Sequence, residues 1–439
     1  MIKIDIPSED KKYIEKMHWQ WFSDYYKDKL QLKKNMKKYS FLRYKKNGKE
    51  EEIVTEVEIV KLLDYLTNQE ILKTLVIGKL VEDDNGKLTA FSITKDILKR
   101  FPLVFNIPIN KNIKSLLKAK RIEIEIVRDR NQDLNEVEKI KTELFNYFEN
   151  NKEILIYYIK NFGDIKQRIE DIKIKNGKIY NFNIDKFIEF KFDKEEIFLE
   201  VRKIFSEIFN YDKFTNINNE SWNAYKLLEK LNVNTCPYCN RSYTNTFYDY
   251  SGMCRADIDH FFPKSKYPFL GVSLYNLIPS CHTCNSSFKG DTDTFFIKHI
   301  YPYENDFGES AKFKTNMRED NPLDYILADS MNFDIILDIK DEIKKNEIQN
   351  SNNMFKIESL YNCHKEIVHE MIKKMYIYNS EKIDELLNQY PQLFKTKKEI
   401  LGILFSSYFE AEDYSKRPLL KFEKDIFEEF DFHKIIKPD

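Results

Sequence analysis

The segment from residue 236 to residue 290 carries three closely spaced motifs: Cys236-Pro237-Tyr238-Cys239, Asp257-Ile258-Asp259-His260 and Cys281-His282-Thr283-Cys284-Asn285. Each Cys-x-x-Cys pair supplies two thiolates from one tight turn, and structural zinc takes four such ligands in a tetrahedron. We therefore expect Cys236, Cys239, Cys281 and Cys284 to hold one Zn²⁺ that fastens both ends of the segment. Unrelated buried cysteines are the alternative. His282 is a possible substitute ligand, but with four cysteines present we expect it at the surface.

An Asp-His pair and an Asn lie beside these cysteines, and their side chains suit phosphodiester hydrolysis. A neutral imidazole, here that of His260, takes a proton from water near pH 7. A hard cation such as Mg²⁺ or Mn²⁺ prefers oxygen ligands, which Asp259 and Asn285 offer as a carboxylate and an amide carbonyl. Adjacent strand residues point to opposite faces, so we expect the backbone to twist or end at His260. Asp257 is either a second acid behind the metal ligand or a solvated surface residue.

The order and spacing of these residues resemble the HNH (ββα-metal) endonucleases over residues 236–290. The matching text is Asp259-His260-Phe261-Phe262-Pro263-Lys264-Ser265, Asn276-Leu277-Ile278-Pro279, Cys281-His282-Thr283-Cys284-Asn285 and Lys289-Gly290. The resemblance implies that His260 ends the first strand and is the general base. It implies that Asp259 and Asn285 hold the catalytic cation, with Asn285 on the helix of the ββα unit. Asn276 would order the loop that positions His260. The implied products carry 5′-phosphate and 3′-hydroxyl ends. Lys289 is either a phosphate contact or an ordinary helix-end lysine.

Two further stretches, Tyr267-Pro268-Phe269-Leu270 and Lys416-Arg417-Pro418-Leu419, are similar to larger bacterial HNH effectors of phage-defence systems. Those effectors include the Septu-type and retron-associated ones. The similarity implies an antiviral role.

The rest of the chain predicts an α+β protein of three parts: a mixed α+β region (1–200), the zinc-stapled nuclease module with a helical lead-in (201–303) and a mainly helical region (304–439). Asn-Gly between alternating runs is a strong hairpin signal. It predicts hairpins at Asn47-Gly48, Asn85-Gly86 and Asn176-Gly177. Alternation predicts a strand over 121–126, and helical spacing predicts helices over 134–148 and 221–231.

Composition limits the class of protein. The 439 residues are 42% hydrophobic and 33% charged, which predicts folded domains and not a disordered chain. No apolar run is long enough to cross a membrane and the start lacks a signal-peptide core, so we expect a cytoplasmic protein. With 10 glycines and no phosphate-binding loop, the chain is not expected to be an NTPase. The aromatic cluster from His18 to Phe22 is expected to pack in a core or an interface.

These observations predict a metal-dependent HNH endonuclease with a structural zinc, acting on nucleic acid, with DNA as the expected substrate. A non-catalytic zinc-stapled nucleic-acid-binding module and an RNA-cleaving toxin using the same site are the alternatives. The net charge of −1 is low for a protein that binds a polyanion by its own field. Control by a partner protein or homo-oligomer, through residues 1–200, is therefore one expectation. A sufficient local basic face is the other.

Overall fold

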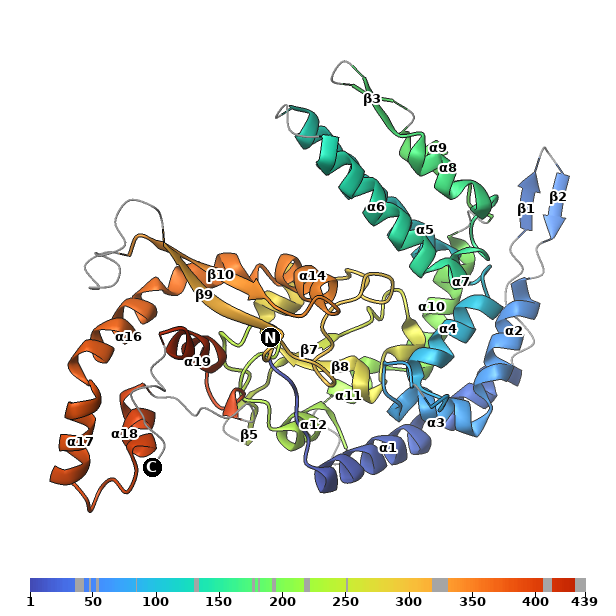
Figure 1. Cartoon of the computed structure of the whole chain (residues 1–439). Helices are drawn as coiled ribbons and strands as arrows, with labels where there is room; N and C mark the ends of the chain where they lie inside the picture. The colour runs from blue at the N-terminus through green and yellow to red at the C-terminus, as the bar shows by residue number, and fades with distance from the viewer. Residues whose placement is uncertain are drawn as a thin grey trace.

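The computed structural model has an α+β fold (Figure 1), as the sequence predicts. It describes residues 1–35, 43–46, 49–52, 55–83, 85–129, 134–175, 178–180, 182–191, 195–216, 222–249, 252–317, 331–405 and 413–430. The strands form two-stranded antiparallel pairs, and helices make up most of the remaining elements. One contiguous cluster of buried apolar side chains runs from α1 to the last helix, α19.

The first half of the chain is helical with two small hairpins. Its elements are α1 (Ser8–Asn35), β1 (Arg43–Lys46), β2 (Lys49–Glu52), α2 (Thr55–Leu66), α3 (Gln69–Ile77), α4 (Ala90–Arg100), α5 (Asn106–Asp129), α6 (Leu134–Asn150), α7 (Lys152–Leu155), η1 (Phe162–Asp164), α8 (Ile165–Glu170), β3 (Lys173–Lys175), β4 (Lys178–Tyr180), α9 (Ile184–Phe187), α10 (Glu196–Ile208) and α11 (Tyr211–Thr215). The helix expected over 134–148 is α6. Figure 1 shows α5 and α6 side by side as an arm that projects from the body.

Two of the three expected hairpins are confirmed. β1 pairs with β2 and β3 pairs with β4, each around an Asn-Gly step that itself lies outside the described residues. The hairpin expected at Asn85-Gly86 is wrong, because helices α3 and α4 flank that step. Helix caps explain the difference. The Asn68 side chain accepts from the first backbone N–H groups of α3, and Thr89 forms a capping box with Ser92 at the start of α4.

The strand expected over 121–126 is also wrong, because this stretch is part of α5. Ile113, Leu117, Ile124 and Val127 are buried, a helical stripe that spans four turns, whereas the alternating Ile122 and Ile126 are exposed. An ion pair from Arg121 to Glu125, one turn later, supports the helix. The packing of α5 against α6 thus decides the structure of this stretch, although its apolar residues alternate as in a strand.

The aromatic cluster near residue 18 lies in the core. His18 is fully buried, and its Nε2 donates to the Val272 carbonyl at 2.7 Å. Its Nδ1 accepts from the Trp222 indole at 3.1 Å. Both ring nitrogens of a neutral imidazole are therefore satisfied, and α1 is tied to the loop that follows β7.

Acid should destabilise the protein through His18. Burial lowers the pKa of His18 from its ordinary 6.5 to about 4, with the Val272 carbonyl opposing the shift. A depressed histidine pKa means that the unfolded chain binds the extra proton first. The stabilising contribution is present above pH 6.5 and is lost as the pH falls from 6.5 towards 4, by about 3 kcal/mol in all. Urea unfolding at several pH values should show this slope, and His18→Gln should flatten it. A slope unchanged in His18→Gln would contradict the assignment.

The second half of the chain contains the central strands and the last helices. Its elements are α12 (Ala224–Leu231), β5 (Phe247–Asp249), β6 (Gly252–Cys254), β7 (Asp257–His260), η2 (Pro268–Leu270), η3 (Leu274–Asn276), β8 (Leu277–Ser280), η4 (Thr283–Lys289), β9 (Ala311–Met317), β10 (Phe333–Ile339), α14 (Lys345–Phe355), α15 (Ile357–Tyr361), η5 (Asn362–His364), α16 (Lys365–Ile377), α17 (Ser380–Gln389), α18 (Lys397–Leu404) and α19 (Leu420–Glu429). The helix expected over 221–231 is α12, capped by Asn223.

Among the described residues after 304, helices predominate, and β9 and β10 form an antiparallel pair that the sequence did not indicate. Asp425 of α19 accepts from the Phe313 backbone at 2.9 Å and so joins α19 to β9. The Leu419 N–H donates to the Asn240 carbonyl at 2.6 Å. The last helix is thereby attached to the turn that carries Cys236 and Cys239. None of the helices that the structure describes is long and apolar enough to cross a membrane.

Candidate metal centre and catalytic pocket

The four cysteines of the two Cys-x-x-Cys pairs come together in space. All four sulfur atoms lie within 4.8 Å of one another, and the Sγ atoms of Cys239 and Cys281 are 3.9 Å apart. Zinc–sulfur bonds of about 2.3 Å in a tetrahedron place neighbouring sulfurs about 3.8 Å apart. The cluster therefore fits one structural zinc. His282 is not part of it and has a side chain that is 80% exposed, as the sequence indicated.

Local backbone structure presents the thiols. The Cys236 N–H donates to the Ser242 carbonyl at 2.9 Å, and Asn240 adopts a left-handed φ of 49° that closes the turn. The Arg241 N–H points at the Cys239 sulfur at 3.4 Å. The second pair begins directly after β8 and runs into the π-helical turn η4. A metal here would join the turn before β5 to the helix that follows β8.

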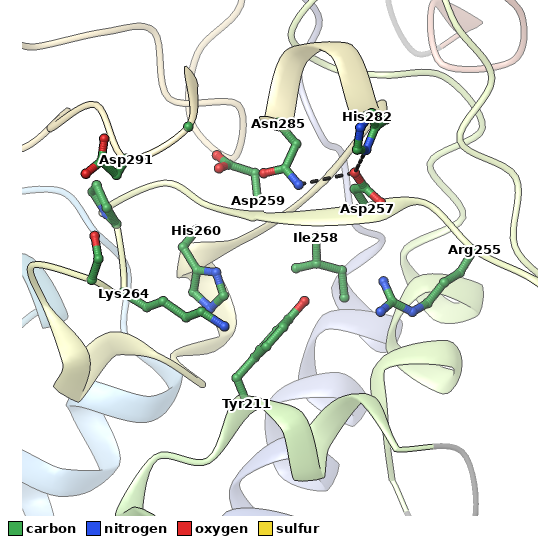
Figure 2. A pocket seen from close by; sticks show the side chains of 13 residues that line it. Tyr211, Arg255, Asp257, Ile258, Asp259, His260, Lys264, His282, Asn285 and Asp291 are labelled. Carbon is green, nitrogen blue, oxygen red and sulfur yellow. Dashed lines mark hydrogen bonds and ion pairs between the residues drawn. The ribbon is translucent and has the colours of Figure 1, made fainter. Parts of the chain in front are cut away.

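β7 and β8 form an antiparallel pair in which Asp259 lies opposite Ile278 and His260 opposite Leu277. With η4 after β8, the order of elements is strand, strand, helix. His260 is the last residue of β7. In the part of the chain that the structure describes, β7 pairs with no strand other than β8. Asp259 and His260 leave opposite faces of the strand, and both line the pocket (Figure 2).

Asn276 organises the loop between the two strands. It is fully buried; its Oδ1 accepts from the Phe262 N–H at 2.7 Å, and its Nδ2 donates to the carbonyls of Phe262 and Leu270 at 3.0 and 3.1 Å. The residue after Leu270, Gly271, packs closely on Phe209, whose carbonyl would lie 3.0 Å from an added Cβ. Asn276 thus holds the loop segment whose Gly271 carbonyl contacts His260.

The same loop fixes the tautomer of His260. Its Nε2 lies 2.9 Å from the Gly271 carbonyl, which can only accept, so Nε2 carries the proton and Nδ1 keeps the lone pair. Burial lowers the pKa of His260 to about 3, against the opposing effect of Gly271. The Tyr211 ring packs edge-on against the imidazole, with ring centroids 4.6 Å apart. The site thus holds a neutral imidazole of defined orientation.

Asp259 is buried, and both of its carboxylate oxygens accept a hydrogen bond. Its Oδ2 accepts from the Tyr238 hydroxyl at 2.6 Å, and its Oδ1 accepts from Lys289 Nζ at 3.0 Å. Lys289 also donates to the His260 carbonyl at 2.7 Å, and its side chain is 1% exposed. Lys289 is therefore neither a free phosphate contact nor a helix-end surface lysine, the two roles that the sequence left open. It is a buried counter-charge for Asp259.

Tyr238 is a residue that sequence reasoning missed. It lies inside the first Cys-x-x-Cys pair, is fully buried and stacks on Phe355 at 4.3 Å. Through its hydroxyl, the turn that holds Cys236 and Cys239 contacts β7 directly. A tyrosine between metal-binding cysteines gives no sequence signal for this role, because its partner is 21 residues away.

Asp257 holds Asn285 and His282. Its Oδ2 accepts from Asn285 Nδ2 at 3.2 Å and lies 2.9 Å from His282 Nδ1. A carboxylate only accepts, so the amide nitrogen of Asn285 faces Asp257 and the amide oxygen turns away from it. In Figure 2 that oxygen lies on the side of Asp259. Asp257, whose side chain is 36% exposed, thus orients Asn285 through this hydrogen bond.

A single pocket of about 440 Å³ is lined by Asp257, Asp259, His260, Asn285 and Tyr211, among others. Asp257, Asp259 and Asn285 border one side of β7, and His260 and Tyr211 border the other (Figure 2). Two cationic side chains flank it: Arg255, and Lys264, whose ammonium lies 4.2 Å from the centre of the Tyr211 ring. The pocket lining thus combines two cationic side chains with three acidic ones, Asp257, Asp259 and Asp291.

Comparison with known proteins gives no relative: no protein-family model matches the chain, and neither the curated proteins nor the solved structures contain a match.

Proposed function

We propose that the chain is a metal-dependent endonuclease of the HNH type that hydrolyses phosphodiester bonds, with DNA as the expected substrate. The observation that carries the proposal is the position and hydrogen bonding of His260. Its Nε2 donates to the Gly271 carbonyl, its Nδ1 carries the free lone pair, and it lines the same pocket as Asp259 and Asn285. A neutral imidazole with a free ring nitrogen can accept a proton from an attacking water.

The donor set fits a hard divalent cation. Each oxygen of Asp259 accepts one hydrogen bond, from Tyr238 or Lys289, and so retains a second lone pair. The amide oxygen of Asn285 is directed away from Asp257 by the bond at Nδ2. Asp259 and Asn285 would hold Mg²⁺ or Mn²⁺, which supplies charge neutralisation at the phosphate and at the leaving oxygen. His260 would accept the proton of the water, while Arg255 and Lys264 attract the phosphate.

The direct test offers the protein duplex DNA, single-stranded DNA and RNA, each with Mg²⁺ and with the ion left out. We expect Mg²⁺-dependent cleavage of DNA. Cleavage of RNA alone would favour the toxin alternative. Binding with no cleavage of any substrate, with Mg²⁺ or Mn²⁺ present, would favour the non-catalytic module and overturn the proposal.

Asp257 gives a prediction about metal affinity. Asp257→Ala should raise the Mg²⁺ concentration for half-maximal cleavage by about 10- to 100-fold, because outer partners that orient a ligand contribute that much to metal affinity. Cleavage at saturating Mg²⁺ should be largely retained. His282→Ala is the matched control: it removes the other partner of the same carboxylate oxygen and leaves Asn285 in place. Equal shifts in the two variants would argue against the orienting role.

A role in phage defence and control by a partner protein or self-association belong to the same proposal. The net charge of −1 supports control of this kind, since the field available to attract a polyanion is small. Full cleavage by the isolated full-length chain, unchanged by protein concentration or by products of adjacent genes, would rule out such control.

A further inference from the structure

The β5–β6 hairpin exposes large side chains on both strands. Every residue of β5 and of β6 is exposed, including Phe247 at 51%, Tyr248 at 61% and Met253 at 59%. Tyr248 lies directly opposite Met253 in the pair. Clustered exposed apolar side chains on a soluble domain mark an interaction site more often than isolated ones do. The hairpin is therefore suited to bind a ligand with flat apolar surfaces.

A row of rings and one cation connects this hairpin to the pocket. The Tyr248 ring lies 5.7 Å from the ring of Tyr225 on α12, and the Arg255 guanidinium lies 5.7 Å from the centre of the Tyr225 ring. Arg255 lines the catalytic pocket together with Asp257 and His260. It also lies in the short link between β6 and β7. A chain bound along this row would enter the pocket directly.

We propose that Tyr248, Tyr225 and Arg255 form a binding surface for the unstacked bases of a nucleic-acid strand whose phosphate enters the pocket. The proposal rests on the proposed function and narrows its substrate to single-stranded or locally unpaired nucleic acid. Stacking of bases on aromatic side chains contributes about 1–3 kcal/mol per base, in addition to the attraction between phosphates and cationic side chains such as Arg255. The stacking contribution does not depend on the net charge of the chain, which is −1. Bases inside an intact duplex are already stacked and cannot reach Tyr248.

The test measures binding of a fluorescent oligothymidylate by anisotropy, with zinc retained and no Mg²⁺ added, so that no cleavage occurs. Tyr248→Ala should weaken binding by about 5- to 150-fold, the stacking free energy converted at 1.4 kcal/mol per factor of ten. Tyr248→Phe keeps the ring and should bind like the wild type. Tyr248→Leu keeps apolar bulk without a π-face and should bind like the alanine variant. Tyr390→Ala removes a tyrosine directly after α17 that is 43% exposed, and this variant should bind like the wild type.

A strand of abasic sites of the same length separates stacking from backbone contact. The wild type and Tyr248→Ala should bind it equally and weakly. An unchanged affinity of Tyr248→Ala for the oligothymidylate, or the same loss on the abasic strand, would overturn the proposal. The proposal would also be overturned if an intact duplex bound as tightly as the single strand and lost as much affinity in Tyr248→Ala. Each of these results would favour a hairpin that binds protein instead.

Failure of the proposed function would look different. Hydrolysis of bis(nitrophenyl) phosphate, a phosphodiester without bases, should require His260 and be indifferent to Tyr248→Ala. No hydrolysis of this ester or of any nucleic acid would count against the enzyme, whereas the anisotropy series would still decide whether the hairpin binds bases.

Discussion

Replacing His260 with alanine should lower the rate of phosphodiester cleavage by about 10²–10⁴-fold, the usual contribution of a positioned general base. The neutral imidazole presents Nδ1 as its basic atom because Nε2 donates to the Gly271 carbonyl. The depressed pKa of His260, about 3, keeps the ring unprotonated over the range in which a cleavage assay is run. Alanine removes the proton acceptor and leaves Asp259 and Asn285 with their own partners. Gel assays of plasmid cleavage under saturating Mg²⁺ would measure the loss.

His364→Ala is a suitable control for this experiment. His364 is a partly buried histidine on η5 that contacts Arg241 and lies outside the pocket, so its removal should leave the rate unchanged. Thermal unfolding and zinc content of His260→Ala should match those of the wild type. Partial recovery of the rate with added imidazole would identify the lost group as a proton acceptor. A His260→Ala variant that cleaves at the wild-type rate would refute the mechanism.

The centre of the site was predictable from sequence because its residues act through short-range patterns. Two Cys-x-x-Cys turns bring four thiols together. The Asp-His pair ends one strand and the Asn follows the last cysteine, so their positions along the chain indicate which side chains line the pocket. Asn276 also has the loop contacts expected of it. Each of these depends on spacing along the chain, which a sequence displays directly.

The contacts that tune the site were not predictable, because they join residues distant in sequence. Tyr238 reaches Asp259 across 21 residues, Lys289 reaches it across 30, and His18 reaches Val272 across 254. No periodicity encodes such pairs. The two wrong expectations have a local cause instead. Helix caps at Asn68 and Thr89 outweigh an Asn-Gly step, and tertiary packing of α5 outweighs an alternating run.

Replacing Cys236 or Cys284 with serine should release the zinc and unfold the module around the pocket. Structural zinc contributes folding free energy directly, about 10–16 kcal/mol in small zinc-binding peptides near neutral pH. Elemental analysis should find one zinc per wild-type chain, on the four-thiolate geometry. The variants should contain much less, unfold at lower temperature and lose cleavage. Cys363→Ser, which changes an exposed cysteine outside the cluster, should keep the zinc and the activity. Active wild-type protein without zinc would contradict the assignment.

The hydrogen bond between Tyr238 and Asp259 allows two roles of the zinc-binding turn to be tested separately: stabilising the fold and positioning Asp259. Tyr238→Phe keeps the ring that stacks on Phe355, so zinc content and thermal stability should stay close to those of the wild type. It removes the hydroxyl at 2.6 Å from Asp259 Oδ2, a hydrogen bond to a charged group worth about 1.5–3 kcal/mol. Cleavage at limiting Mg²⁺ should therefore fall about 10- to 100-fold, because Asp259 loses a partner that orients it. Cys236→Ser should lose zinc and cleavage together. If Tyr238→Phe cleaved normally at every Mg²⁺ concentration, the zinc turn would stabilise the fold without positioning the catalytic carboxylate.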